Sequence, residues 1–296
     1  MSTINLLQKA IKIRQEHGTI PLLKRSAAFS RNRFAKTKAY RSLMRHRYGT
    51  ADLLKIGFPK SGNTWVHFLM ANSVVGAANR TDDVHFKNLK HWMAGSEKPP
   101  TRPPVEGFPK MRGTHDKRSE AIYLGENTKI VYVVRHPGDV MESFYHWRRD
   151  FWKDIEVGTF SEFIRSEHGV QRWVNHVESW EDRWDLLIKF EDLKKDPAYQ
   201  LREIWNLMDK EINEPTIQYA VEQSSFENMS RMEENYGLKE KDGRNPEANF
   251  MREGDSDAGE AYFDAKDWQY LNRTAGDLMS RLEYTVDNVN EKSVPS

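Results

Sequence analysis

Cysteine is missing from all 296 residues of the sequence. Disulfide bonds, thiolate metal ligands and cysteine nucleophiles are therefore excluded, and a reducing compartment is compatible with the composition. Long apolar runs are missing too, because no uninterrupted stretch approaches the ~20 residues that span a bilayer. Residues 1–18 contain no continuous apolar core of the signal-peptide type. We therefore expect a soluble, cytoplasmic protein with no membrane span.

Negative charge is nearly absent from residues 1–50, which hold 12 Lys or Arg residues and one acid, Glu16. The rest of the chain holds 33 basic and 43 acidic residues, so the net charge of +1 conceals a basic arm and an acidic body. Such an arm could contact nucleic acid, an anionic membrane or the body itself, or serve as a transit peptide. Interspersed apolar residues favour a partly helical extension over residues 1–50, with no nucleic-acid partner, followed by one domain over residues 51–296.

Apolar residues are plentiful enough for a sizeable core, at 38% of the sequence. After the arm, strand-like runs alternate with helix-like runs, as in residues 53–58 before 64–77, and residues 129–134 before 138–151. Strands that alternate with helices indicate a parallel sheet. The predicted fold class is therefore α/β, a single domain with a central parallel β-sheet flanked by helices. Pro137 and Pro197 are well placed to open helices, the second behind Asp196 as N-cap.

The stretch GFPKSGNTW, residues 57–65, joins a strand-like run to a helix-like run through a turn that contains glycine. Such a loop presents unpaired backbone N–H groups and the positive end of a helix dipole, which together bind anions. Gly62 lets the backbone approach a phosphate closely, and Lys60 comes before this glycine. The nucleotide-triphosphate motif places its lysine after the last glycine, so this loop does not match that motif.

A second strand-to-helix turn lies in VVRHPGDVMESFYHW, residues 133–147. Arg135 follows a strand-like run, and the carboxyl ends of parallel strands are where open α/β sheets bind ligands. Ser143 follows two helical turns later. An arginine fork and a hydroxyl can hold a second phosphate, although a structural salt bridge from Arg135 to Asp139 is the simpler alternative.

Together these segments closely resemble the cytosolic-type sulfotransferases that use 3′-phosphoadenosine 5′-phosphosulfate (PAPS). PKSGNTW is similar to their P-K-S-G-T-T-W loop, and YVVRHPGDVMESFYH fits their 3′-phosphate motif throughout. QSSFENM resembles the segment that borders adenine, and FMREG is similar to their F-M-R-K-G. The matching segments occur in the family's order at residues 59–65, 132–146, 223–229 and 250–254.

The resemblance implies a P-loop-like strand–loop–helix that binds the 5′-phosphosulfate. The residues that would surround the 5′-phosphate and the sulfuryl group are Lys60, Ser61, Gly62, Asn63 and Thr64. By the same resemblance, Trp65 and Phe226 would sandwich adenine, and the 3′-phosphate would be held by Arg135, Ser143, Arg252 and Gly254. PAPS is then the co-substrate, and no metal ion is required.

Four positions depart from the family's pattern. Asn63 replaces a threonine and can still donate a hydrogen bond, whereas Glu253 replaces a basic residue beside the 3′-phosphate. Gly113 stands where the family commonly has lysine, and Phe190 where it often has tyrosine. The family's usual dimerisation sequence is not recognisable, so the oligomeric state stays open.

PKMRGTHDK, residues 109–117, resembles the family's K-T-H segment and places His115 as the catalytic base. A histidine titrates near neutral pH and suits this role, while Lys60 would stabilise the charge of the leaving oxygen. Weaker candidates for the base are His67, His85, His91 and His136.

The sequence thus predicts a sulfotransferase that moves a sulfuryl group from PAPS to a hydroxyl or amine of a small-molecule acceptor. Two alternatives stay open, a P-loop nucleotide or small-molecule kinase and a non-enzymatic nucleotide-binding module. The acceptor is expected between the loops 79–107 and 231–249, which contain several acids. Those acids are compatible with a cationic or hydroxylated acceptor, but solvated loop residues explain them more simply.

Overall fold

The computed structural model describes residues 38–93, 105–152, 156–236, 245 and 262–285. The chain divides into two units, residues 1–49 and residues 50–296. Within the first, the described element is helix α3, Lys38–Tyr48, whose last turn is basic. All other described helices and strands belong to the second unit, which contains the whole candidate site.

Four parallel strands form the sheet described in the second unit, in the order β2-β1-β3-β4. These strands are β1 Leu53–Gly57, β2 Met111–Thr114, β3 Lys129–Val134 and β4 Leu186–Lys189. Their register brings the carboxyl ends level, because Gly57 pairs with Val133 and Val134 with Lys189. The predicted parallel sheet is confirmed, and any residue that directly follows a strand lies at one edge of it.

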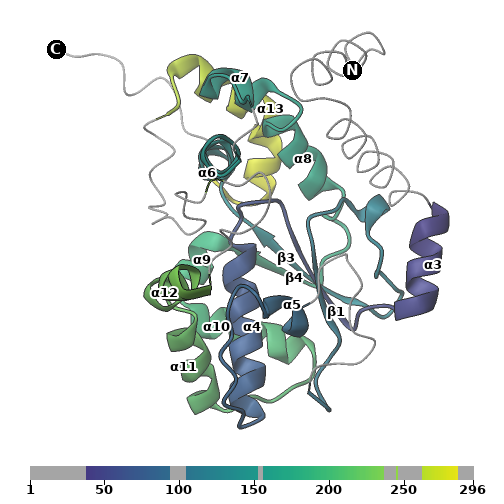
Figure 1. Ribbon diagram of the computed structural model, residues 1–296. Helices are drawn as coiled ribbons and strands as arrows, with labels where there is room; N and C mark the ends of the chain where they lie inside the picture. The colour runs from purple at the N-terminus through teal and green to yellow at the C-terminus, as the bar shows by residue number, and fades with distance from the viewer. Residues whose placement is uncertain (1–37, 94–104, 153–155, 237–244, 246–261, 286–296) are drawn as a thin grey trace, which may run out of the picture. The chain divides into compact units, whose positions relative to one another are not determined.

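Helices cover both faces of this sheet (Figure 1). On one face α4, Asn63–Ala77, packs against α10, Pro197–Leu207, and α11, Glu214–Gln223. On the other face α6, α7, α8 and α13 contact one another. Their bounds are Pro137–Asp150, Phe160–Arg165, Val170–Glu178 and Ala265–Arg281. The shorter elements are α5 Leu89–Trp92, η1 Arg118–Glu120, α9 Phe190–Lys195 and α12 Phe226–Tyr236.

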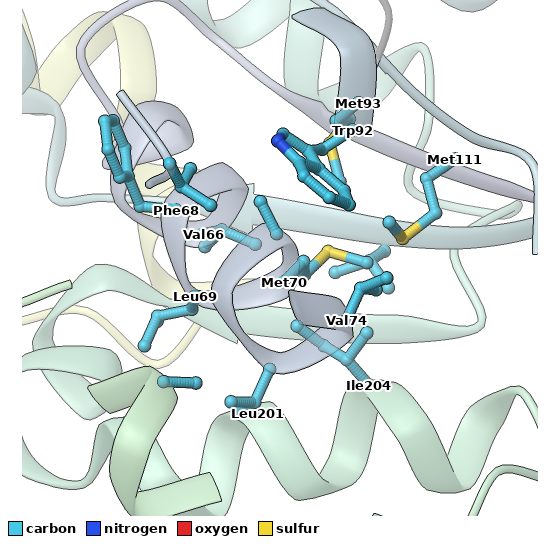
Figure 2. Close-up of a cluster of buried hydrophobic side chains, with 14 of the residues drawn as sticks. Val66, Phe68, Leu69, Met70, Val74, Trp92, Met93, Met111, Leu201 and Ile204 are labelled. Carbon is cyan, nitrogen blue, oxygen red and sulfur yellow. The ribbon is translucent and has the colours of Figure 1, made fainter. Parts of the chain in front are cut away.

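Helix α4 is held by apolar side chains along most of its length. Figure 2 shows Val66, Leu69 and Val74 of this helix among side chains from β2 and α10, such as Met111 and Ile204. Each of these five side chains is at most 1% exposed. Full burial of one such side chain contributes roughly 1.5–3 kcal/mol, so this packing fixes the helix whose first turn borders the loop 58–62.

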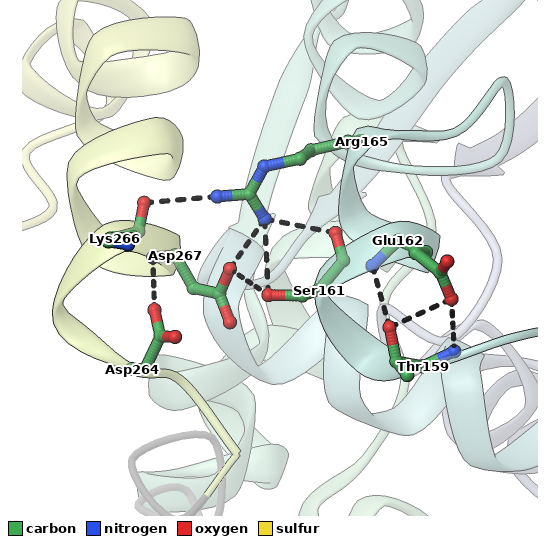
Figure 3. A network of polar contacts seen from close by, with 7 residues as sticks. All are labelled: Thr159, Ser161, Glu162, Arg165, Asp264, Lys266 and Asp267. Carbon is green, nitrogen blue, oxygen red and sulfur yellow. Dashed lines mark hydrogen bonds and ion pairs between the residues drawn. The ribbon is translucent and has the colours of Figure 1, made fainter.

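Polar contacts fix the opposite layer (Figure 3). Arg165 and Ser161 of α7 both donate to the buried Asp267 carboxylate of α13. Asp264 caps the same helix by accepting from the Asp267 backbone N–H at 2.7 Å. The sequence prediction for two other helix starts is confirmed, because Pro137 opens α6 and Asp196 caps α10. α7 and α13, which these contacts join, both pack against α6 and α8, the helices that carry site residues.

Candidate active site

The ends of the four strands bring most of the predicted site residues to one edge of the sheet. β1 leads into the loop 58–62, β2 ends one residue before His115, β3 ends before Arg135, and β4 ends before Phe190. β1 continues into α4 on one face, whereas its neighbour β3 continues into α6 on the other. Adjacent strands whose connections diverge in this way create the crevice in which α/β proteins bind ligands.

The loop 58–62 has the backbone of an anion site. Lys60 and Gly62 have left-handed conformations, with φ of 71° and 91°. Gly62 precedes α4 without a capping side chain, and α4 has no acid in its first turn, so no carboxylate neutralises that end of the helix. A Cβ atom at position 62 would lie 2.5 Å from Phe190 Cδ2, so the close contact with Phe190 also requires glycine. Ser61 is fully buried, and its Oγ has no hydrogen-bond partner among the described residues.

The Asn63 side chain is directed into the protein. Its Nδ2 donates to the Phe58 carbonyl at 2.7 Å, and its Oδ1 accepts from Lys55 Nζ at 2.6 Å. Both partners are in the strand–loop segment that precedes α4. The Asn63 side chain therefore links the first turn of α4 to β1 and to the start of the loop 58–62. We therefore expect the Asn63 backbone N–H, rather than its amide group, to face a bound anion.

Lys55 is a site residue that the sequence interpretation missed. It is fully buried in the middle of β1, where burial lowers the pKa of its ammonium group well below the usual value. In the sheet Lys55 pairs with Gly113, and a Cβ atom at Gly113 would lie 2.5 Å from His67 Nε2. Position 113 therefore has no side chain, and a lysine of the neighbouring strand lies beside it. The signal in the sequence was a charged residue inside the apolar run LLKIGF.

His115 has the tautomer that a general base needs. Its Nδ1 lies 2.6 Å from the Gly57 carbonyl oxygen, which only accepts, so Nδ1 carries the hydrogen and Nε2 keeps its lone pair. His115 is an exposed residue, yet the protein around the imidazole disfavours its charged form. This desolvation and the positive charges of Lys55, Arg172 and Lys60 lower the pKa of His115 to about 4, against the opposing Gly57 hydrogen bond. At neutral pH the imidazole is therefore neutral and able to take a proton.

A buried pair of side chains holds the His115 backbone. Tyr132 OH donates to His176 Nδ1 at 2.7 Å, and His176 Nε2 donates to the His115 carbonyl at 3.0 Å. Desolvation is the main cause that lowers the pKa of His176 to about 3, so His176 is neutral at neutral pH. His176 was not among the sequence candidates, because its spacing from Trp173 and Trp180 on a helix resembles ordinary core packing.

Arg135 lies at the end of β3 and is only 6% exposed. Its Nη2 donates to Asp139 Oδ2 at 3.3 Å, so the salt bridge considered from the sequence does form. The guanidinium also lies 4.5 Å from the Phe190 ring centroid, while its Nε has no partner among the described residues. Burial raises the pKa of Asp139 to about 6 despite Arg135. Ser143 is partly buried on α6, two turns further along.

The two rings predicted to hold adenine each lie at the start of a helix. Trp65, in the first turn of α4, packs edge-on against Phe190 with ring centroids 6.1 Å apart. Phe226 opens α12 and is 39% exposed, so its ring is accessible to a ligand. Arg252, Glu253 and Gly254 lie outside the described residues. Among the weaker histidine candidates, the partly buried His67 is close enough to His115 for their charged forms to disfavour each other.

Across the described residues, no group of three or more acidic or histidine side chains is arranged to hold a metal ion. None of the helices in the described part of the chain is long and apolar enough to cross a membrane. The fold is that of an α/β protein in which the strand–loop–helix from β1 to α4 has the backbone features of an anion site. The chain belongs to the sulfotransferase family, whose family model, described as "Sulfotransferase domain", matches residues 50–283.

Curated relatives agree with this family. The chain is 29% identical to human sulfotransferase 1C2 over 197 residues, which cover 60% of this chain and 65% of that protein. It is 25% identical to rat sulfotransferase 2A2 over 239 residues, 72% of this chain and 78% of the relative. The matched region thus spans 65% of the length of sulfotransferase 1C2.

Solved structures show the same fold. Mouse sulfotransferase SULT7A1 complexed with PAP has a TM-score of 0.53 at 20% identity, covering 78% of this chain and 84% of that one. Retinol dehydratase in complex with androsterone and inactive cofactor PAP has a TM-score of 0.58 at 18% identity, covering 83% and 82%. At these identities the likeness concerns the fold of the chain.

Proposed function

We propose that this protein is a PAPS-dependent sulfotransferase that moves a sulfuryl group to a hydroxyl or amine of a small-molecule acceptor and releases PAP, adenosine 3′,5′-bisphosphate. The observation that carries the proposal is the meeting of the loop 58–62, His115 and Arg135 at three neighbouring strand ends. A cytoplasmic location and the absence of a nucleic-acid partner remain part of the proposal.

The described residues fit a ligand with two phosphates. Ser61 Oγ and Arg135 Nε are buried donors without a partner among these residues, which is costly unless a ligand supplies an acceptor. Because the two residues follow adjacent strands, β1 and β3, we assign them to two separate anion sites. A bisphosphate of adenosine satisfies both, and Trp65 and Phe226 supply rings for its base.

The proposed reaction is an in-line displacement at sulfur. The acceptor oxygen or nitrogen forms a bond to sulfur as the bond from sulfur to the bridging phosphate oxygen breaks. His115 Nε2 takes the acceptor's proton, since its Nδ1 is already committed to Gly57. The Lys60 ammonium stabilises the negative charge that grows on the bridging oxygen.

Ligand binding separates this proposal from the kinase alternative, whose loop would place lysine after glycine. We expect PAP at about 100 times its Kd to stabilise the protein by about 2.7 kcal/mol, a rise in Tm of roughly 5–10 °C. Differential scanning fluorimetry measures this, with ATP plus Mg²⁺ and adenosine 5′-phosphate as comparison ligands. Stabilisation by ATP plus Mg²⁺ with no response to PAP would contradict the proposal.

Arg135→Ala tests the second anion site in the same assay. Because Arg135 is expected to hold the 3′-phosphate, the variant should respond to PAP no more than to adenosine 5′-phosphate. Arg183→Ala, on a partly exposed arginine near the start of β4, is the matched control and should keep the full PAP response. If Arg135→Ala keeps the full PAP response, Arg135 does not bind the 3′-phosphate, and its role is limited to the structural salt bridge with Asp139.

Lys55→Met tests the buried lysine beneath the loop. Removing its positive charge should raise the pKa of His115 from about 4, since Lys55 is the largest charge that lowers it. A base works in its neutral form, so activity falls as pH drops through this pKa, and the acidic limb of kcat/KM should move to higher pH. A pH–rate profile between about pH 4 and 8 measures the change. If kcat/KM instead falls equally at every pH and the acidic limb does not move, the role of Lys55 is only to hold the Asn63 side chain.

A further inference from the structure

Two arginines of the layer above the sheet have no acidic partner at ion-pair distance among the described residues. Arg148 is near the end of α6 and Arg172 is in the first turn of α8, and both are partly buried. Their guanidinium carbons each lie 6.0 Å from the centroid of one ring, Phe144. The two positive charges thus lie against the same aromatic ring and are close enough to repel each other. Binding of one negatively charged group by both arginines would relieve this repulsion.

A chain of contacts places Arg172 beside the proposed base. Its guanidinium carbon lies 5.7 Å from the Phe58 ring centroid, and Phe58 packs edge-on against His176 at 5.6 Å. His176 in turn donates to the His115 carbonyl. In agreement with this geometry, the charge of Arg172 is one of those that lower the pKa of His115. The arginine pair therefore belongs to the side of the site where His115 would meet the acceptor.

The surrounding groups leave this region positive. Arg172 Nη1 donates to His168 Nδ1 at 3.1 Å, so this imidazole is neutral in the contact. The acids within reach of the arginines are Glu167 and Glu120, and Glu167 is 71% exposed, with its oxygen 3.8 Å from His168 Nε2. α8 follows Gly169, which supplies no capping side chain, and its first turn contains no acid, so the positive end of its dipole adds to the same field.

We propose that the sulfuryl acceptor carries an anionic group, such as a carboxylate, which pairs with Arg148 and Arg172 while its hydroxyl or amine reaches His115 Nε2. This inference rests on the proposed function and names the substrate class. A cationic acceptor is disfavoured, because its charge would be placed beside two arginines. Of the acids in the predicted acceptor loops, Asp82 already pairs with the Arg80 guanidinium, so it is not left to bind a cation.

Three phenols of similar size test the inference: 4-hydroxyphenylacetate, its neutral amide 4-hydroxyphenylacetamide, and the amine tyramine. We expect kcat/KM for the carboxylate to exceed that for the amide by at least roughly tenfold, with tyramine last, since hydrogen bonds to charged groups are the stronger ones. Arg172→Gln and Arg148→Gln should each reduce the preference for the carboxylate by roughly 10- to 100-fold and leave the amide nearly unchanged. Binding of the carboxylate and the amide to the protein–PAP complex, measured by calorimetry, gives the same comparison without turnover.

Arg149→Gln is the matched control, because Arg149 is the next residue on α6 and already pairs with Asp150 at 2.6 Å. This variant should keep the preference for the carboxylate. Equal binding of carboxylate and amide, no binding of either, or a preference that survives both arginine substitutions overturns the inference. An equal loss with all acceptors also overturns it and assigns the arginines to the sulfuryl donor. Stabilisation by PAP is read separately, so failure here is distinguishable from failure of the proposed function.

Discussion

Replacement of His115 by alanine is expected to lower kcat by roughly 10²- to 10⁴-fold, the usual contribution of a general base. The reason is that Nε2 is the atom left to accept a proton once Nδ1 donates to Gly57. PAP affinity should stay nearly unchanged, because His115 follows β2 whereas the two expected phosphate sites follow β1 and β3. Single-turnover transfer of labelled sulfate, with PAP binding measured in parallel by calorimetry, checks both parts.

His91→Ala provides the control for loss of a histidine, since His91 is exposed on the short helix α5. It should retain wild-type transfer and PAP binding. If His115→Ala lost PAP binding to the same extent as activity, its role would be to hold the nucleotide, and the assignment as base would be wrong. His115→Gln keeps a side-chain amide that can donate to the Gly57 carbonyl, so its loss of activity would be specific to the missing base.

The fold could be predicted because its signals are local. Alternation of apolar runs with helical periodicity indicated a parallel sheet, and Pro137 and Asp196 marked the helix starts that the structure confirms. The loop 58–62 was recognisable for the same reason, since a strand, a turn and a helix follow one another directly in the chain. Once the sheet is known to be parallel, motifs that follow different strands are expected at the same edge of it, even when they are far apart in the sequence.

Contacts between distant segments could not be predicted in this way. Lys55 and Gly113 are 58 positions apart, and only the register of β1 with β2 makes them neighbours. The Asn63 side chain is likewise held inside the protein by Lys55, a residue that belongs to no motif. Arg148 and Arg172 meet on Phe144 because α6 packs against α8, and helix packing leaves no short pattern in the sequence.

Replacement of Lys60 by alanine is expected to lower kcat by roughly 10²- to 10³-fold, as loss of one preorganised group that stabilises developing charge usually does. The backbone of Lys60 has φ of 71°, a left-handed conformation that costs any residue with a Cβ atom about 1–2 kcal/mol. Alanine has the same backbone cost as lysine, so the substitution removes the ammonium group without adding strain. Steady-state transfer with saturating PAPS measures the loss.

Lys60→Gly separates the chemical role of this lysine from its effect on the loop. Glycine relieves the left-handed strain but adds freedom to the unfolded chain, by about 0.4–1 kcal/mol, so the free energy of unfolding should change little or rise slightly. Activity should nevertheless fall as far as in Lys60→Ala. A residue kept in a strained conformation although glycine would fold as well is typical of a functional site. Retention of kcat in both variants would contradict the assignment of Lys60 to the leaving oxygen.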